Sequence, residues 1–447
     1  MKRLVAVTLL VATATNLASC VESADGVNGS GATFPQQFQA WATTTYSRET
    51  GQVVLYANPA GGSSKGKADF KANLNDFGGT DSAVKDSQAA DFPWVYVPYV
   101  GGAVGILYRL DALDGATLSL GANTLRGILS GRISHWNDPD IVADMLRAQP
   151  WVNDIADQQV EGVTTFIAQT DTESVQVTLL LNPGALRRLV GTQVTVNVDS
   201  RTFRGAVDGG QVTLSIPAAS SALVEVVVQD TIVARYERRT IPMPDVPITV
   251  IYRADGSGTS NNLCKFLAAG SQDWTVNDAF VSCVPGGSEH VASLGSRFQG
   301  QTGSANLANY VSNTDGAIGY SEVSFAVEAT RWNRGTRVAS IENAAGRFVP
   351  PTPDAVSAFL AESSVDDTGF VALIYDQPDN HGAYPIAAVT YALGKVEKSR
   401  EGDIVRDYFR WILDDFAPRY AQALGYAPLA GELKTRALVQ VEQVSSR

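Results

Sequence analysis

The chain shows two kinds of hydrophobic pattern, which predict two kinds of structure. Over most of its length, short apolar runs alternate with stretches in which apolar residues recur at helical spacing, as Phe38, Trp41 and Tyr46 do. Between about 152 and 243, apolar and polar residues instead alternate in short runs separated by turn signals such as Asn182-Pro183-Gly184. The first pattern predicts an α/β structure, and the second predicts strands alone.

The region from 152 to 243 is expected to form a small β-sandwich. Short strands separated by turns have the length and spacing typical of that architecture. They are predicted over 164–168, 175–181, 193–198, 201–207, 211–216, 223–228 and 231–236. This insert could contact a protein partner, the cell envelope or a glycan, or it could serve only as a structural spacer. No residue within it forms a recognisable site.

Outside this region, three turns rich in glycine, serine and threonine each follow an apolar run and open a helical stretch. They lie at 29–35, 60–66 and 252–260. A strand, turn and helix in this order direct free backbone N–H groups and the positive end of a helix dipole at one point, which suits an anion. A fourth apolar run ends in Asp81. Because ligands bind at the carboxyl ends of parallel strands, these four strand ends are expected to meet in one cleft.

The turn at 252–260 carries the most donors. Arg253 adds a forked cation, and Ser257 and Thr259 add hydroxyl groups to the backbone N–H groups. A nucleophile elbow would need glycine where Asp255 and Thr259 stand, and a nucleotide-hydrolase loop would need a lysine that this turn lacks. A phosphatase with Ser257 as nucleophile has neither a paired base nor metal ligands, so it is kept only as an alternative.

A simpler interpretation applies to each of these turns. Glycine and serine are common where a loop caps a helix. Thr33, Ser63 and Asp81 would then serve only as helix N-caps, a frequent use of such side chains.

The composition limits the ligands and partners of the protein. A formal net charge of −12 and a pI near 4.8 argue against nucleic acids and anionic membrane surfaces. Local donors in a closed cleft can still bind an anion, because the global field is screened beyond roughly 10 Å. His135, His290 and His381 share no ligand spacing, so neither a metal site nor a cofactor is expected.

The first 20 residues are predicted to be an export signal. Lys2 and Arg3 precede an apolar run over 4–12 that is too short to cross a bilayer. The ending Leu17-Ala18-Ser19-Cys20 resembles a bacterial lipobox, in which the cysteine becomes lipidated. An ordinary cleaved signal with a chance cysteine is the alternative. We therefore expect a protein of the periplasm or cell envelope, held by a lipid anchor at Cys20.

The remaining cysteines agree with export. Cys264 and Cys283 form a pair that predicts a disulfide in an exported protein, with two buried thiols as the alternative. After the signal, about 427 residues remain (447 minus 20), too many for a single core and typical of two or three domains.

Four motifs in chain order point to a known family. They are Gly31-Ala32-Thr33-Phe34-Pro35, Gly62-Ser63-Ser64, Phe77-Gly78-Gly79-Thr80-Asp81 and Arg253-Ala254-Asp255-Gly256-Ser257-Gly258-Thr259. They resemble the phosphate-contacting motifs of the substrate-binding protein of ABC-type phosphate importers, the PstS-like phosphate-binding periplasmic proteins. Further matches lie at 131–138, 316–320 and 384–386. The resemblance covers nearly everything except about 152 to 243, a stretch that the family pattern lacks.

The resemblance implies a role for each matching residue. Arg253 would bind a phosphate oxygen and be oriented by Asp255, while Asp81 would accept the proton that phosphate keeps near neutral pH and sulfate does not. Hydroxyl and backbone donors would complete the shell. The implied phosphate-binding set is Thr33, Phe34, Ser63, Asp81, Arg253, Asp255, Ser257, Gly258 and Thr259. Lys65 replaces a glycine usual in the family and is expected to point to solvent, although it could add a cation near the ligand.

The resemblance also implies a type II periplasmic-binding-protein fold, with two α/β lobes that close on the ligand like a hinge. Residues 27–97 and 339–447 would form lobe I, 98–151 and 244–338 lobe II, and 152–243 the insert. The implied function is non-enzymatic, high-affinity binding of inorganic phosphate by a monomer that serves an ABC importer. A phosphate scavenger or sensor that uses the insert stays open, because Val21 after the lipobox cysteine would favour outer-membrane sorting.

Overall fold

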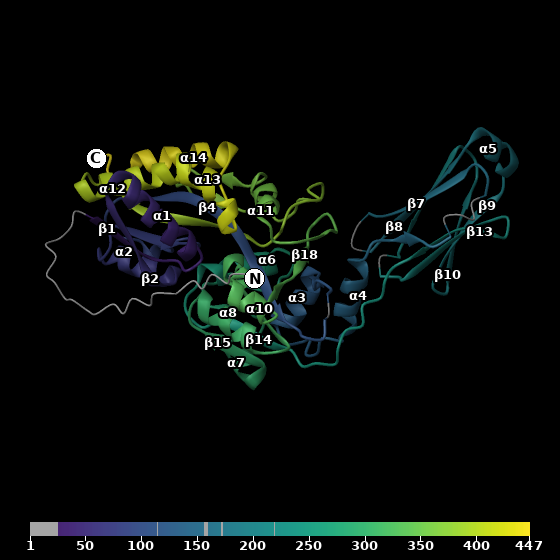
Figure 1. The fold of residues 1–447 in the computed structure, drawn as a ribbon, viewed down its shortest axis with the longest axis horizontal. Coiled ribbons are helices and arrows are strands. Elements are labelled where there is room, and N and C mark those ends of the chain that lie inside the picture. The colour runs from purple at the N-terminus through teal and green to yellow at the C-terminus, as the bar shows by residue number, and fades with distance from the viewer. Residues whose placement is uncertain (1–25, 114, 156–159, 171–172, 219) are drawn as a thin grey trace, which may run out of the picture.

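The fold is organised around one long strand. The computed structural model describes residues 26–113, 115–155, 160–170, 173–218 and 220–447. Strand β4 (Trp94–Arg109) has 16 residues and is buried along nearly its whole length. Because both of its faces are covered, its sequence is a continuous apolar run rather than an alternating one. Figure 1 shows this strand running between two groups of helices and strands.

Strand β4 belongs to both halves of a mixed sheet. Its residues Trp94–Ala103 pair with β22 (Ala387–Lys395), and its residues Val104–Arg109 pair with β16 (Ala317–Glu322). The strand order is β15-β14-β16-β4-β22-β3-β1-β2. We call the part built on β22, β3, β1 and β2 lobe I, and the part built on β16, β14 and β15 lobe II. The two-lobed α/β architecture expected from the motifs is confirmed.

Lobe I places three strand ends side by side. Strand β1 (Gly26–Gly31) pairs in parallel with both β2 (Val53–Gly61) and β3 (Phe77–Thr80). Helix α1 (Gln36–Thr50) follows β1, and α2 (Ser63–Lys71) follows β2. Their N-termini therefore lie at the edge of the sheet where β3 ends. Lobe I also contains α11 (Pro353–Leu360), β20 (Ser364–Val365), β21 (Val371–Ala372), α12 (Arg400–Trp411), α13 (Ala417–Tyr420), β23 (Tyr426–Ala427) and α14 (Gly431–Gln443).

Helix α1 differs from the expected pattern at one position. Phe38 and Tyr46 are buried in the core, as the helical spacing predicts, but Trp41 is 63% exposed. The buried face of α1 instead includes Gln39 and Ala42, and the Gln39 side chain accepts a hydrogen bond from Tyr408 at 2.6 Å. A buried polar residue with a partner has taken the place that an apolar one was expected to fill.

Lobe II repeats the same arrangement. Strand β14 (Thr249–Arg253) pairs in parallel with β15 (Phe298–Gln301) and with β16. Helix α6 (Gly258–Ala269) follows β14, and α8 (Ser304–Asn313) follows β15. Lobe II also contains β5 (Ser119–Leu120), α3 (Ala122–Leu129), α4 (Pro139–Arg147), α7 (Gly287–Ser293), α9 (Val323–Val327), α10 (Ala329–Asn333), β17 (Arg337–Val338), β18 (Ser340–Glu342) and β19 (Phe348–Val349).

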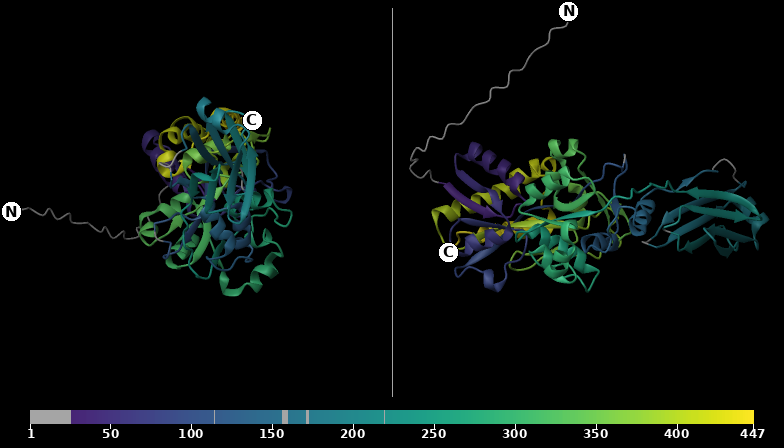
Figure 2. Two further views of the ribbon diagram at one scale, coloured as in Figure 1. Left: turned by 90° about the vertical axis from the view of Figure 1, so that its right-hand side faces the viewer. Right: turned by 90° about the horizontal axis from the view of Figure 1, so that it is seen from below.

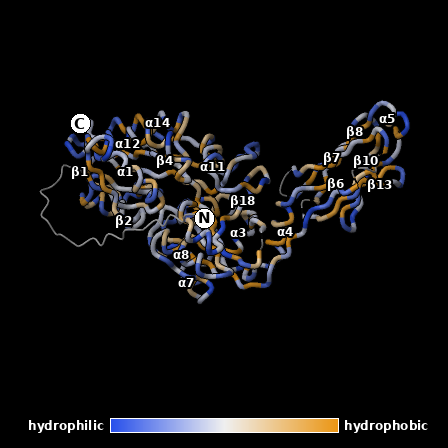
Figure 3. The backbone as a smooth tube through the Cα atoms, viewed as in Figure 1, coloured by the Kyte–Doolittle hydropathy of each residue, from blue (hydrophilic) through white to orange (hydrophobic). Residues whose placement is uncertain are grey.

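Residues 152–237 form separate sheets beyond α4, at the end of the molecule away from lobe I (Figure 2). One sheet has the order β10-β9-β12-β13-β6 and the other β11-β8-β7. Buried and exposed residues alternate along β8, β9 and β12, and hydrophobic and hydrophilic positions alternate along this region in Figure 3. The strands are β6 (Val152–Asn153), β7 (Val163–Gln169), β8 (Val175–Leu181), β9 (Gln193–Val198), β10 (Arg201–Ala206), β11 (Gln211–Ile216), β12 (Leu223–Val228) and β13 (Thr231–Glu237).

Two elements of this region were not expected from the sequence. Short strand β6 pairs with β13, and the segment Asn182-Pro183-Gly184 opens helix α5 (Pro183–Leu189) instead of a simple turn. The side chain of Asn182 accepts a hydrogen bond from the N–H of Ala185 at 2.8 Å, and Pro183 occupies the first helical position, where no N–H is needed. The same residues that predict a turn also cap a helix.

The apolar cluster of this region consists of different residues from the cluster of the two lobes. Val177, Val196 and Val226 belong to the first, whereas Val100 and Val389 belong to the second. That 152–243 is an independent inserted domain stays a prediction.

Substitutions in the two clusters should act separately. Val196→Ala should cost about 1–3 kcal/mol, because it leaves a cavity in a site with no exposed surface. The loss should appear as reduced hydrogen-exchange protection in β8, β9 and β12, with protection in β4 and β22 unchanged. Val100→Ala, equally buried, is the matched control and should show the reverse pattern. A uniform loss of protection in both variants would contradict separate cores.

Candidate anion-binding site

The site begins with a guanidinium that is fixed in place. Arg253 ends β14, and its side chain is 1% exposed. Its Nε donates to Oδ1 of Asp255 at 2.7 Å, and its Nη2 donates to Oδ2 of the same carboxylate. Burial would raise the pKa of Asp255, but the bonds and charge of Arg253 outweigh burial and lower that pKa below its usual value. Asp255 therefore fixes the orientation of the Arg253 guanidinium.

The remaining nitrogen of this guanidinium reaches the other lobe. Nη1 of Arg253 donates to Oγ1 of Thr33 in lobe I and to Oγ of Ser304 in lobe II, both at 3.1 Å. The two hydroxyl groups also lie 3.1 Å apart. The Gly303 N–H, next to Ser304, donates to Asp255 at 3.0 Å, which fixes the start of α8 beside Arg253. Thr33 was predicted at this point and Ser304 was not.

Asp81 supplies a buried carboxyl group at the end of β3. Its Oδ1 accepts from Oγ1 of Thr390 at 2.5 Å, and its Oδ2 accepts from Oγ of Ser63 at 3.3 Å. Burial raises the pKa of Asp81 to about 7, although these hydroxyl groups and the charge of Arg253 act in the opposite direction. The group therefore titrates near neutral pH.

The start of α6 packs directly against the Asp81 cluster. A Cβ atom at Gly258 would lie 2.5 Å from Oγ of Ser63 and 2.6 Å from Cβ of Asp81, so only glycine fits at this contact between the lobes. Nδ2 of Asn262 donates to the backbone oxygen of Asp81 at 2.6 Å and to that of Gly258 at 2.9 Å. Lobe II thus brings a helix N-terminus within van der Waals distance of the lobe I carboxyl group.

Two hydroxyl groups at this helix start have different roles. Ser257 is the N-cap of α6, and its Oγ accepts from the N–H of Ser260 at 3.2 Å. Thr259 is 1% exposed, and within the described residues its Oγ1 has no hydrogen-bond partner. A buried hydroxyl normally has one. At the start of α6, Thr259 therefore has a buried hydroxyl group whose hydrogen-bonding capacity no other described residue uses.

The structure brings the predicted residues together. Direct contacts link Thr33, Arg253 and Asp255 on one side and Ser63, Asp81 and Gly258 on the other; Phe34, Ser257 and Thr259 are their chain neighbours. Lys65 lies away from the cluster, where it pairs with Asp69 and its side chain is 54% exposed.

Sequence reasoning missed Ser304 and Thr390. Ser304 follows a strand and a glycine, so it carries the same strand–turn–helix signal as the three predicted turns. Thr390 lies within β22, and nothing in its local sequence marks it; only the pairing of β22 with β3 brings it to Asp81.

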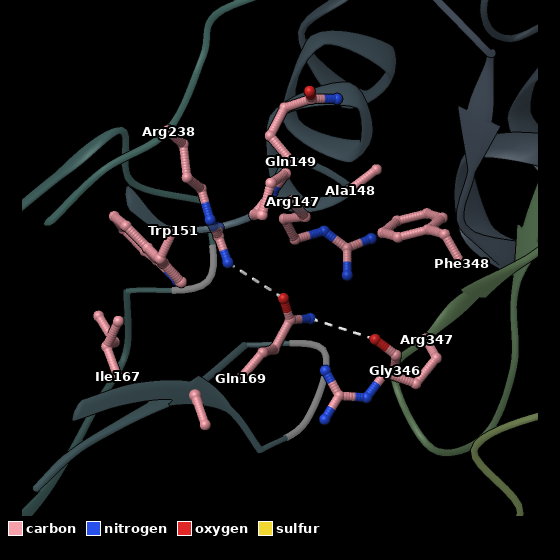
Figure 4. Close-up of a pocket in the computed structure, with 12 residues that line it drawn as sticks. Arg147, Ala148, Gln149, Trp151, Ile167, Gln169, Arg238, Gly346, Arg347 and Phe348 are labelled. Atoms are coloured by element: carbon pink, nitrogen blue, oxygen red, sulfur yellow. Dashed lines mark hydrogen bonds between the residues drawn. The ribbon is translucent and has the colours of Figure 1, made fainter. Parts of the chain in front are cut away.

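The 440 Å³ cavity in Figure 4 is a different feature. It lies between α4, β19 and the strands that follow residue 150, and its lining includes Arg147, Arg238 and Arg347 but none of the predicted anion-binding residues. Gln169 accepts from Nη2 of Arg238 at 3.2 Å and donates to the Gly346 oxygen at 3.3 Å. These bonds link the 152–237 region to lobe II.

Three further features concern the part of the chain that the structure describes: metal-binding clusters, membrane-spanning helices and cysteine pairing. Its described residues contain no group of three or more His, Cys, Asp or Glu side chains that could hold a metal ion. Among the helices of the described residues, none is long and apolar enough to cross a membrane.

Cys264 and Cys283 are joined by a disulfide with a Cα–Cα distance of 6.0 Å, which ties α6 to the segment after it. Cys20 lies outside the described residues.

The sequence is similar to a family model and to several known proteins. A family model described as a PBP superfamily domain matches residues 13–180 and 228–415. The chain is 22% identical to the phosphate-binding protein PstS of Xylella fastidiosa (strain Temecula1) over 411 residues, covering 91% of this chain and 82% of that protein. It is 24% identical to the phosphate-binding protein PstS of Haemophilus influenzae over 374 residues, covering 83% and 78%.

Solved structures show the same architecture. The structure of a high-affinity periplasmic phosphate-binding protein (PfluDING) bound with phosphate matches with a TM-score of 0.54 and 20% identity, covering 92% of each chain. A phosphate-binding protein from Stenotrophomonas maltophilia matches with a TM-score of 0.51 and 18% identity, covering 93% of each chain. The family match extends over more than half of the sequence, and this chain therefore belongs to the PBP superfamily.

Proposed function

We propose that this protein binds inorganic phosphate between its two lobes and delivers it to an ABC importer. The observation that carries the proposal is the meeting of a guanidinium, Arg253, and a carboxyl group, Asp81, around the helix start at Gly258. The names of the PstS relatives, and the phosphate bound in a solved structure of the same fold, support this ligand. The activity is binding and not catalysis.

Asp81 determines which oxyanion the site accepts. A carboxylate meets an oxygen of an anion favourably only when a proton lies between them. Phosphate keeps a proton near neutral pH, whereas sulfate would meet the carboxylate lone pair to lone pair. Sites built around such a hydrogen bond discriminate by about 10⁴–10⁵. Above its pKa of about 7, Asp81 is ionised and can accept this proton.

The other contacts come from both lobes. Lobe I would provide Thr33, Phe34 and Ser63 at the starts of α1 and α2, and lobe II would provide Ser257 to Thr259 at the start of α6. Because the ligand contacts both lobes, it favours the closed arrangement by its difference in affinity between the closed and open states. Binding and closure are then one event.

Export and lipid anchoring belong to the same proposal. The features of residues 1–20 support secretion, with Cys20 as the lipidation site, and the protein would act as a monomer at the cell envelope. We propose 27–97 with 339–447 as lobe I, 98–151 with 244–338 as lobe II, and 152–243 as an insert, with two exceptions. The part of β4 up to Ala103 pairs within lobe I, and β18 and β19 form a sheet with β5 of lobe II. The separate apolar cluster of residues 163–236 supports the last of these boundaries.

Removal of the guanidinium should nearly abolish binding. Arg253→Ala removes a charge-assisted donor inside a closed site, so the affinity for phosphate should fall by roughly 100-fold or more. Titration calorimetry with the purified mature protein measures this change. Arg331→Ala is the matched control, because Arg331 is also nearly buried and bonds to Asn309 and Phe325 within lobe II. Wild-type affinity in Arg253→Ala would contradict direct contact with the ligand.

Neutralising the buried carboxyl group should change selectivity. An amide in Asp81→Asn can donate to sulfate, so the ratio of phosphate to sulfate affinity at pH 8 should fall by roughly 100-fold or more. Competition calorimetry with both anions measures the ratio. Asp86→Asn makes the same charge change at an exposed position and should leave it unaltered. An unchanged ratio in Asp81→Asn would refute the role given to Asp81.

The raised pKa of Asp81 should also appear in the stability of phosphate-free protein. The folded state holds the proton up to about pH 7, whereas the unfolded state loses it near 3.8, so this group's contribution to stability is greatest below pH 3.8 and declines as the pH rises to 7. The free energy of unfolding of Asp81→Asn minus that of wild type, measured in urea, should therefore increase by a few kcal/mol from pH 4.5 to pH 7.5. A parallel pH dependence in the two proteins would exclude the raised pKa; Asp86→Asn again serves as control.

A further inference from the structure

We propose that Lys67 and Asp278 are affinity-determining residues that touch no phosphate oxygen: they form a buried ion pair across the cleft and set the rate at which the ligand leaves. Lys67 lies on α2 in lobe I, and Asp278 lies between α6 and α7 in lobe II. Nζ of Lys67 donates to Oδ2 of Asp278 at 2.7 Å. The inference rests on the proposed function and deepens it.

The pair is buried and has good geometry on both sides. The Lys67 side chain is 1% exposed and that of Asp278 is 10% exposed. Oδ2 of Asp278 also accepts from Oγ of Ser64 at 3.3 Å, and Oδ1 accepts from Nδ2 of Asn261 at 3.0 Å. A buried ion pair whose remaining atoms are hydrogen-bonded holds its partners firmly, and loss of one partner leaves the other charge buried and uncompensated.

Each member keeps partners within its own lobe. Nζ of Lys67 donates to Oγ of Ser82 at 3.0 Å and to the oxygen of Ala83 at 3.1 Å, both in lobe I. Asp278 keeps Asn261 in lobe II. When the lobes separate, each side chain therefore retains part of its hydrogen bonding, and water replaces the rest. Such a pair can form and break as a unit, which is what a latch between two rigid bodies requires.

The Lys67–Asp278 pair, which we call the latch, is connected to the anion-binding turn at 252–260 through backbone hydrogen bonds. The oxygen of Asp278 accepts from the N–H of Ser257 at 2.9 Å, and the N–H of Ser64, next to Ser63, donates to the oxygen of Gly256 at 3.2 Å. Closure of the Lys67–Asp278 pair thus coincides with the positioning of Ser63 against Gly258. The pair therefore forms in the same closed arrangement that ligand binding requires, and it stabilises that arrangement.

The test compares Lys67→Met, Asp278→Asn and the double variant in the full mature protein. Each single variant should release phosphate at least about tenfold faster than wild type, with the association rate nearly unchanged, because truncating one partner of a buried pair acts mainly on dissociation. The double variant should release phosphate more slowly than the product of the two single effects predicts, since it leaves no uncompensated charge. Stopped-flow displacement of radiolabelled phosphate measures these rates.

An exposed ion pair provides the control. Arg132 and Asp140 lie 3.1 Å apart on lobe II, with side chains 59% and 50% exposed, and do not bridge the lobes. Arg132→Met and Asp140→Asn should change the release rate by no more than about twofold. Thermal unfolding of every variant separates a loss of overall stability from a change in release.

A measurement without phosphate distinguishes failure of the latch from failure of the proposed function. Spin labels at Trp41→Cys in lobe I and Ser296→Cys in lobe II, both exposed positions, report the distance between the lobes in phosphate-free protein. The distance distribution should shift to longer values in Lys67→Met and Asp278→Asn relative to wild type. Unchanged distances and release rates would overturn the proposal, even if the variants melt at lower temperature. If wild-type protein binds no phosphate, the proposed function fails, and the distances alone decide the latch.

Discussion

The anion-binding site is organised around a buried cation, Arg253, held at the contact between the two lobes. Arg253 has almost no exposure to water, and burying an unpaired guanidinium would be very unfavourable. Asp255 compensates its charge through two parallel hydrogen bonds and leaves Nη1 pointing at Thr33 in the opposite lobe. In the proposed function, an anion bound at this nitrogen would contact both lobes and would therefore favour the closed arrangement.

The fold makes this arrangement possible by sharing one strand between the lobes. Strand β4 pairs with β22 up to Ala103 and with β16 from Val104 onward, so the lobes can change their relative orientation while each keeps its own ladder. The helix starts that converge on the cleft follow parallel strands, and their N-terminal N–H groups and dipoles supply positive potential without adding charged side chains. This explains how a protein with a net charge of −12 can present an anion site.

Features that depend on residues close together in the sequence could be predicted from the sequence alone. The seven predicted strands between 164 and 236 lie within one residue of the observed boundaries, because alternation with a period of two is a strong local signal. The predicted anion-binding residues follow strand ends, so their convergence could also be foreseen. Thr390 and the Lys67–Asp278 pair could not, since they meet only through tertiary contacts between segments 211 to 309 residues apart. Helix α5 was missed because capping residues and turn residues are the same types.

Equilibrium binding of three oxyanions to the wild-type protein tests the central claim most directly. The mature protein, freed of phosphate, is titrated with phosphate, arsenate and sulfate at pH 8 in a calorimeter. If the site selects a protonated tetrahedral oxyanion, phosphate and arsenate bind at one site per chain and sulfate gives no measurable heat of binding. Sulfate affinity within tenfold of phosphate affinity, or no binding of phosphate, would contradict the account.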